Sequence, residues 1–324
     1  MKLCLLTIGL LATQTLAHPG MDRLLAEIQA RDDVLVEGRS TSLMGDLLGG
    51  NLTPVGRSIG NILQGGSAIV DGGTYKAPGP LGSNAYPARG AIRQGFHDAG
   101  TWDQDSPYGG ADGSIVFSDE LSRIENRGLE QIVARTRAWY DKYRQYGAGM
   151  ADLIQAAALT AIVSCPGGPR IPLYVGRKDD RRAGPTQKLP SPFQDAQSLI
   201  DLFAAKTFTA SDLVALLGSH TASRQRFVDR ARAGAAQDSS PNTWDNKYYS
   251  ETLSSDNRTI FVFPSDRNLA TYSATSAQWN IFARPGGNAA WKPAFASAYF
   301  RMSLLGVNNL NHLVDCSKVI PLPR

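Results

Sequence analysis

The chain is poor in cysteine for its length. Its 324 residues include three cysteines, and the first of them, Cys4, lies in the leader predicted below. Cys165 and Cys316 remain, so the mature chain could form at most one intramolecular disulfide. A disulfide framework is therefore excluded as the main source of stability. A chain of this length can instead bury one large core, or form two lobes that share a core.

Histidine is equally scarce, and neither sign of charge is concentrated. The four histidines, His18, His97, His220 and His312, have no paired spacing of the kind that binds zinc, so a metal-dependent hydrolase has little support. The chain has 33 Lys and Arg and 29 Asp and Glu, interspersed, for a net charge of +4. We therefore expect no nucleic-acid partner. No segment after the N-terminus is long and apolar enough to predict a membrane span, so no membrane partner is expected.

The N-terminus has the pattern of a secretory signal. Lys2 supplies the positive start, residues 3–11 are largely apolar, and Thr15-Leu16-Ala17 fits a cleavage site of small residues. This pattern predicts a signal peptide over residues 1–17 and a secreted, extracellular protein. Residues 18–76 are expected to form a pro-segment or a loosely ordered arm. Possible glycosylation triplets begin at Asn51 and Asn257.

Hydrophobic spacing predicts a mainly α protein without internal repeats. Apolar residues recur at helical intervals in most segments, whereas residues 72–87 are rich in Gly and Pro and are expected to be coil. Gly109–Ser114 is expected to be a turn, residues 171–192 largely loop, and Thr259–Phe263 one short strand. Helices are expected from Pro87 to Gly100 and over residues 129–143, 152–163, 192–206, 211–221, 265–272, 276–282 and 291–306.

The stretch from Ala91 to Gly100 carries the first candidate site. If it is helical, Arg93 and His97 lie four residues apart and share a face, and Asp98 points away from them. A guanidinium and an imidazole presented together can polarise a small polar ligand. Taken alone, the pattern is more typical of an ordinary helix with a surface arginine and a hydrogen-bonded histidine.

A second stretch, from Ser211 to Thr221, changes that interpretation. It predicts an apolar helix that begins at a capping Ser or Asp and delivers His220 at its end. In this order, Arg-x-x-Phe-His-Asp and Gly-Ser-His-Thr resemble the plant, fungal and bacterial haem peroxidase superfamily, over roughly residues 87–316. The run Gly-Ala-Asp-Gly-Ser and the C-terminal Asp-Cys-Ser-Lys-Val-Ile-Pro are most similar to secreted fungal members.

The resemblance implies a fold and one cofactor. The fold would be mainly α, with two helical lobes that hold one haem b between a distal half, ending near residue 180, and a proximal half after it. The haem peroxidase domain would cover residues 77–324.

The resemblance also implies a proximal haem ligand. His220 would bind the iron, and Asp266, in the run Phe-Pro-Ser-Asp-Arg, would accept a hydrogen bond from its other ring nitrogen. Without the other motifs, Asp266 would be interpreted as a helix N-cap. Arg224 and Arg226 would pair with haem propionates or, almost equally well, with local acids.

On the distal side, the resemblance implies a catalytic group around His97. His97 would move the peroxide proton as acid and base, and Arg93 would stabilise the charge that develops as the O–O bond breaks. Asn126 would accept a hydrogen bond from His97, with Glu120 supporting it. Phe96 would flank the distal pocket.

Two oxygen-rich clusters follow the family spacing and imply two calcium ions. Carboxylates, hydroxyls and backbone carbonyls suit a hard cation with many ligands. Taken alone, each cluster would be interpreted as a solvated turn. The distal ligands would be Asp98, the Gly110 carbonyl, Asp112 and Ser114; the proximal ones would be Thr221, Asp238, Ser240, the Thr243 carbonyl and Asp245.

The implied activity is that of a secreted haem peroxidase. It would reduce hydrogen peroxide and oxidise small aromatic donors, phenols among them, by one-electron steps. Pro190 resembles the proline at the exposed haem edge where such donors approach, and a monomer is expected. The alternative is a secreted calcium-binding paralogue with impaired or no haem catalysis, which the presence or absence of a Soret band would distinguish.

Two specialised activities of the family are not expected. Its manganese sites use acidic residues at positions that correspond here to Ala85, Arg89 and Arg226, and two cations there would repel the metal. The exposed, radical-forming tryptophan of ligninolytic relatives corresponds to Ala215.

The chain departs from secreted fungal members before the distal helix. Those members carry several disulfides and an extra cysteine-bearing helix there, whereas residues 72–87 contain no cysteine. The family partners of Cys165 and Cys316 are also absent, so both are expected to be unpaired thiols. Either a segment is missing from this sequence or the lineage has lost it, and we expect the distal helix to be less well supported than in relatives.

Overall fold

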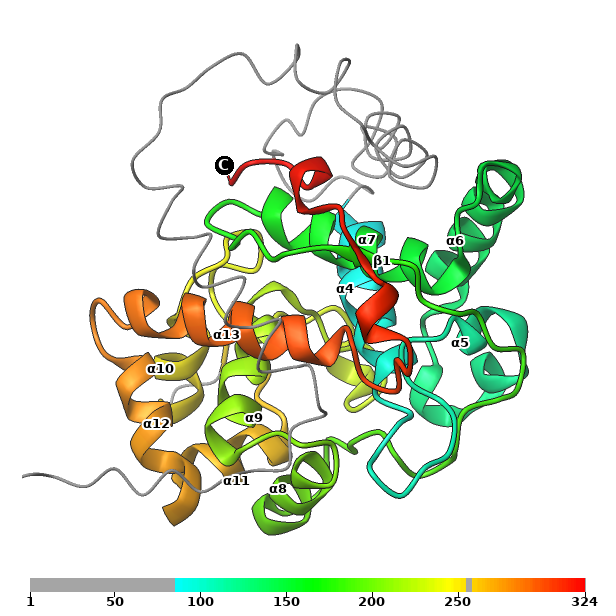
Figure 1. Ribbon diagram of the computed structural model, residues 1–324. Helices are drawn as coiled ribbons and strands as arrows, with labels where there is room; N and C mark the ends of the chain where they lie inside the picture. Colours follow the sequence, from blue (N-terminus) through cyan, green and yellow to red (C-terminus); the bar gives the residue numbers. More distant parts are fainter. Residues whose placement is uncertain (1–84, 255–257, 324) are drawn as a thin grey trace, which may run out of the picture. The chain divides into compact units, whose positions relative to one another are not determined.

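The computed structural model describes residues 85–254 and 258–323, which all belong to one compact unit. These residues are mainly helical, as the hydrophobic spacing predicted (Figure 1). The predicted signal peptide, the predicted pro-segment or arm, most of the predicted coil and both asparagines of the possible glycosylation triplets lie outside the described residues.

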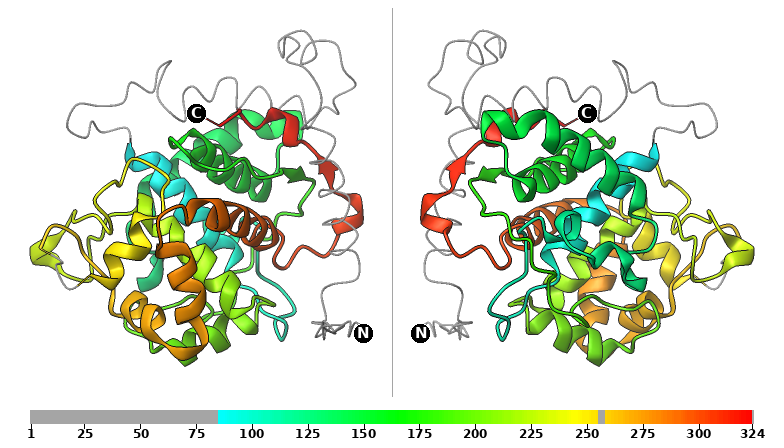
Figure 2. Two further views of the ribbon diagram at one scale, coloured as in Figure 1. Left: turned by 90° about the vertical axis from the view of Figure 1, so that its left-hand side faces the viewer. Right: turned by 90° about the vertical axis from the view of Figure 1, so that its right-hand side faces the viewer.

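The described chain contains two groups of helices, joined by α13, which runs across both groups (Figures 1 and 2). The first group comprises α4 (Ala85–Ala99), α5 (Ser114–Phe117), α6 (Glu130–Tyr143) and α7 (Met150–Ser164), with 3-10 turns η2 (Glu120–Ser122), η3 (Ile124–Asn126) and η4 (Arg144–Tyr146). The second comprises α8 (Ala196–Ala204), α9 (Ala210–Leu217), α10 (Lys247–Leu253), α11 (Pro264–Thr271), α12 (Ser273–Ala283) and α13 (Asn288–Met302). Its 3-10 turns are η5 (Gly218–Ala222) and η6 (Arg230–Arg232), whereas the C-terminal turns η7 (Leu310–His312) and η8 (Ser317–Val319) lie on the side of the first group, beside α7 (Figure 1).

Helix α7 is the centre of the first group because its sequence is Ala-rich and has no polar face. All 15 of its residues are buried, and α4 packs along it. The helices approach closely at Gly95, where an added β-carbon would lie 2.8 Å from the Ala158 methyl group on α7 and 2.6 Å from the Tyr299 hydroxyl on α13. Three helices therefore meet beside the Arg93–His97 stretch and fix its position.

No single described helix is long and apolar enough to cross a bilayer. By length and composition only, the bent pair Glu130–Tyr146 and Met150–Ser164, at 120°, meets that test.

Large aromatic side chains fill the second group. Trp244 and Trp291 stack with their ring centroids 5.9 Å apart, and Trp279 lies 5.1 Å from the ring of Tyr249. All four side chains are fully buried. Because each buried aromatic removes roughly 150–250 Å² from water, the cluster contributes much of the apolar burial of this half. The Trp291 indole also lies against Gly218, where an added β-carbon would be 2.3 Å away, so α13 fixes the end of α9 just before His220.

Several short elements differ from the predictions. Residues 259–263 form no strand, although they are rich in β-branched and aromatic residues, because Phe261 makes a single backbone bond, to the Ala236 carbonyl, instead of pairing along a strand. A two-residue strand, β1 (Tyr174–Val175), lies in the predicted loop and pairs antiparallel with β2 (Val314–Asp315). The helix predicted to reach Thr221 ends as α at Leu217 and continues as the tighter η5. Helices α5 and α10 were not predicted.

Candidate active site

Helix α4 presents the distal group. His97 is 8% exposed, and its Nδ1 lies 2.7 Å from Oδ1 of Asn126 in η3. The Asn126 amide nitrogen donates to the Glu120 carbonyl at 2.7 Å, which fixes Oδ1 as the acceptor for His97. The His97 proton therefore lies on Nδ1, and Nε2 is left as an acceptor.

The Arg93 guanidinium is held by the same short segment that carries Asn126. Its Nη2 donates to the Glu125 carbonyl and its Nη1 to the Arg127 carbonyl, both at 2.7 Å, while Nε donates to Nε2 of His97 at 3.1 Å. One short segment, from Glu125 to Arg127, thus holds the side chains of both Arg93 and His97.

Electrostatics keep His97 neutral. Burial is the main cause that lowers its pKa well below 6.5, and the neighbouring Arg93 charge lowers it further. The hydrogen bond to Asn126 acts in the opposite direction and is the smallest of the three effects. An imidazole that is neutral at neutral pH, with one nitrogen held and the other accepting, can take up a proton from a bound ligand. Phe96 packs its ring edge-on to His97, with centroids 5.6 Å apart.

The proximal group lies at the end of α9. This helix begins with a capping box, in which Thr209 and Asp212 satisfy each other's backbone amides, and it delivers His220 in η5. Nδ1 of His220 lies 3.0 Å from Oδ2 of Asp266, a fully buried carboxylate in the first turn of α11. The rings of Tyr248 and Phe263 pack edge-on to the imidazole, each at 5.6 Å.

Oxygen atoms gather behind both histidines. The predicted distal ligands come together in the turn that precedes α5: Asp98, fully buried, accepts from the Gly113 amide at 3.0 Å, and Asp112 accepts from the Ser114 amide at 2.9 Å. Asp112 itself donates through its backbone amide to the Gly110 carbonyl at 2.8 Å. The Ser114 hydroxyl is fully buried beside the Asp112 carboxylate. Burial, then the proximity of Asp112, raises the pKa of Asp98 well above its ordinary value, and burial raises that of Asp112 to about 6.

The proximal cluster is built in the same way. The Thr221 hydroxyl donates to Asp238 and also lies 3.3 Å from the Thr243 carbonyl, while Ser240 donates to Asp245 at 2.8 Å. Burial raises the pKa of Asp238 to about 7, and Asp245 adds to this. Among the described residues, no three His, Cys, Asp or Glu side chains are grouped to hold a metal ion. Each cluster therefore offers two carboxylates, with hydroxyl and carbonyl oxygens completing the set.

Comparison with known proteins decides the family. A family model described as peroxidase matches residues 79–285. This chain belongs to the peroxidase family. It is 32% identical to the low-redox potential peroxidase of Taiwanofungus camphoratus over 234 residues, which is 66% of this chain and 68% of that protein. Manganese peroxidase 3 of Phlebia radiata is 31% identical over 234 residues, 66% of this chain and 63% of that protein. The peroxisomal L-ascorbate peroxidase 5 of Arabidopsis thaliana is 33% identical over 217 residues, 67% and 75% of the two chains.

The peroxidase is thus a haem-dependent oxidoreductase that uses hydrogen peroxide and oxidises small electron donors. Its residues fit a haem. With Nδ1 of His220 engaged by a carboxylate, Nε2 has no hydrogen-bond partner among the described residues, and the side chain is 28% exposed although its partner Asp266 is buried. A neutral imidazole oriented by an acceptor on its other nitrogen is the usual protein ligand of haem iron.

Two features of the peroxidase were not found from the sequence. From the sequence, Arg89 was noted only because it stands where the family's manganese sites have an acidic residue. In the structure it joins α4 to the second group of helices by donating to the carbonyls of Ala222 and Pro241, at 2.6 and 2.9 Å. Gln237 donates to the carboxylate of Asp266 at 3.1 Å. Neither glutamine nor a backbone carbonyl carries a motif signal, so only the fold reveals these contacts. Cys165 and Cys316 are unpaired, as expected.

Proposed function

We propose that His220 is the axial ligand of the haem iron and that His97, Arg93 and Asn126 act on hydrogen peroxide. The main support is that both histidines use Nδ1 in the same way. Each Nδ1 is fixed by a buried acceptor, Asn126 for His97 and Asp266 for His220, which turns each Nε2 away from that acceptor. Nε2 of His97 accepts a hydrogen bond from Nε of Arg93 at 3.1 Å, so the two groups proposed to act on the peroxide lie together. Haem, when bound, supplies the two-electron reduction of the peroxide and the one-electron oxidation of donors.

His97 and Arg93 then share the work on the peroxide. Nε2 of His97 takes the proton from the inner peroxide oxygen and returns it to the outer one, so that water leaves. Arg93 faces the negative charge that develops on the separating oxygen, and because Glu125 and Arg127 already hold its guanidinium, little reorganisation is needed. Asn126 keeps the His97 proton on Nδ1. Phe96 limits the width of the pocket beside His97.

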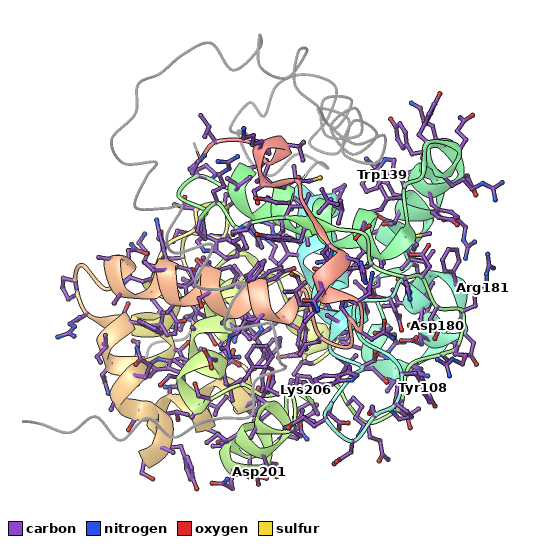
Figure 3. All side chains as sticks on the ribbon, viewed as in Figure 1. Tyr108, Trp139, Asp180, Arg181, Asp201 and Lys206 are labelled. Carbon is purple, nitrogen blue, oxygen red and sulfur yellow. The ribbon has the colours of Figure 1, made fainter. Side chains whose placement is uncertain are left out.

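The donors would be small aromatic molecules such as phenols. Lys188, two residues before Pro190, pairs with Asp103. The buried Lys206, labelled in Figure 3, donates to the carbonyl of the adjacent Trp102 at 2.8 Å. Burial lowers the pKa of Lys206 to about 8. If Pro190 lies at the exposed haem edge, a fixed, half-buried segment there would favour small planar donors over a bulky polymer. Ala215, at the position of the radical-forming tryptophan of ligninolytic relatives, is fully buried and supports this choice.

Efficient manganese oxidation is not part of the proposal. At one of the positions where the family's manganese sites have an acidic residue, this chain has the guanidinium of Arg89, which also donates to Oδ1 of Asn242 at 2.8 Å. A cation anchored in this way would repel Mn²⁺. We expect steady-state oxidation of Mn²⁺ to show no saturation at micromolar metal, whereas saturation there would contradict this part of the proposal.

Two calcium ions would brace the histidines. Asp98 and Thr221 each follow a functional histidine directly in the sequence, so a cation at either cluster would hold one haem-facing segment. Burial, and to a lesser extent the neighbouring carboxylates, raises the pKa of Asp98 and of Asp238, so a bound cation would stabilise the charged forms of both clusters. We expect metal analysis of active protein to find two calcium ions, and chelation to broaden the Soret band. Active protein that contains no calcium would end this proposal.

The proposed organisation is a secreted monomer with a leader over residues 1–17, a pro-segment or N-terminal arm over 18–76 and a catalytic domain over 77–324. Secretion is supported by the leader pattern and by the fungal relatives. N-terminal sequencing of protein recovered from the medium, and light scattering of the same sample, test the cleavage site and the monomer.

Three histidine variants test the central proposal. His220→Ala is expected to lose stable haem binding. His97→Ala is expected to bind haem but to react with peroxide roughly 10²–10⁴ times more slowly. His312→Ala, which changes an exposed histidine in η7, serves as the matched control and should retain the wild-type spectrum and rate. A normal five-coordinate ferric spectrum in His220→Ala, or a wild-type peroxide rate in His97→Ala, would refute the assignment.

A further inference from the structure

Gln237 is a buried side chain that the reaction scheme above does not use. It lies in the loop before α10 and is 1% exposed. Its Nε2 is 3.1 Å from Oδ2 of Asp266 and 3.4 Å from Nδ1 of His220. Oδ2 is also the oxygen that accepts from His220. One carboxylate oxygen therefore receives two donors.

Ser223 sets the orientation of the Gln237 amide. Because the Asp266 carboxylate can only accept, the Gln237 amide must face it with Nε2, and Oε1 then accepts from the Ser223 hydroxyl on the other side. Nδ1 of His220 cannot be the acceptor, because its own proton is directed to the same carboxylate. The amide thus donates to Asp266 alone. A backbone bond from Gln237 to the Ser223 carbonyl at 3.4 Å joins the two segments.

We propose that Gln237 is a positioning residue that tunes the proximal histidine through Asp266. This inference rests on the proposed role of His220 as iron ligand. A carboxylate that accepts from a ligand imidazole raises the basicity of that imidazole. A second donor on the same oxygen withdraws charge from it, and the position of Asp266 in the first turn of α11 has the same effect. A less basic axial imidazole favours ferrous over ferric iron.

Gln237→Leu removes the donor and keeps an apolar side chain of similar length. In the full-length, haem-loaded protein we expect the iron–histidine stretching band of the ferrous form to move to higher frequency. We also expect the ferric/ferrous midpoint potential to fall. A change of about tenfold in the ferric-to-ferrous ratio, which is the size expected for one hydrogen bond, corresponds to about 59 mV for one electron.

A second variant and a control keep the test decisive. Ser223→Ala removes the hydrogen bond to Oε1, so the Gln237 amide is held less firmly against Asp266. The iron–histidine band and the midpoint potential should then move in the same direction as in Gln237→Leu, by a smaller amount. This variant remains informative even if Gln237→Leu fails to bind haem. Gln225→Leu changes another buried glutamine of the same segment, whose amide donates to the carbonyls of Asp229 and Arg232, and should leave both unchanged.

The outcomes separate this inference from the proposed function. Haem-bound Gln237→Leu and Ser223→Ala with wild-type band and potential would overturn the role of Gln237. An iron–histidine band that persists in His220→Ala would instead overturn His220 as the ligand.

Discussion

Replacing Asn126 by leucine removes the centre of the distal network. Asn126 is fully buried and makes two hydrogen bonds of 2.7 Å, one from its amide nitrogen to the Glu120 carbonyl and one from His97 to its side-chain oxygen. Leucine has a similar size but supplies neither group. The Glu120 carbonyl and Nδ1 of His97 would both remain buried without these partners.

The cost can be estimated for each group. A buried polar group left unpaired costs about 1–3 kcal/mol, so the free energy of unfolding should fall by about 2–6 kcal/mol. Because the bond to Asn126 raises the pKa of His97, its loss leaves the imidazole less basic. Its orientation and tautomer are also no longer fixed. Together these changes should slow the reaction with peroxide by roughly 10–100-fold, which is less than the full contribution of His97.

Stopped-flow absorbance of the haem-loaded variant with excess peroxide measures the rate, and urea unfolding measures the stability. Asn126→Asp is the informative comparison, because a carboxylate keeps the acceptor for His97 but places a negative charge beside it and should raise the pKa of His97. Haem-bound Asn126→Leu that reacts at the wild-type rate would refute the proposed role of this hydrogen bond.

Three further predictions concern other parts of the molecule. Because the pKa of His97 is lowered, the rate of reaction with peroxide should be constant through neutral pH and should fall only below pH 6.5. Arg93→Leu removes one cause of the lowered pKa, so in this variant the rate should begin to fall at a higher pH. A pH series of stopped-flow rates measures both. Because the folded state disfavours protonated His97, the free energy of unfolding should also fall as the pH drops below about 6.5. Gly218→Ala places a methyl group 2.3 Å from the Trp291 indole, and thermal melts should show a loss of about 1–3 kcal/mol and earlier release of haem. Thiol titration of the denatured, unreduced mature protein should count both Cys165 and Cys316; a count of zero would show that they had paired.

Sequence reasoning succeeded where chemistry and periodicity coincide. The Arg93–His97 spacing is a weak signal taken alone, and it gained weight only from the second motif at His220. Asn126 and Asp266 came from the family resemblance, and the structure places each within hydrogen-bond distance of the histidine assigned to it. The long helices were recovered to within a few residues at most ends because their apolar faces repeat over several turns.

The failures have physical causes. Elements of two to four residues, such as β1 and α5, are too short to show a period. Residues 259–263 have strand propensity, but no neighbouring strand of the described chain pairs with them in the fold, so they form no strand. The carbonyls of Glu125 and Arg127 that hold Arg93 are backbone atoms, which every sequence supplies equally. Gln237 lies in a polar loop without a motif, and only folding places it against Asp266.

The uneven distribution of tryptophan gives the half of the described chain that holds His220 an optical signal of its own. Trp244, Trp279 and Trp291 are fully buried in the aromatic cluster of the second group of helices, whereas Trp102, which follows α4, and Trp139, on α6 and labelled in Figure 3, are half-buried. Blue-shifted fluorescence therefore comes mainly from the half that holds His220, while circular dichroism records the helices of both halves. Melting curves that separate by these two signals would reveal that the two halves unfold as distinct cooperative units.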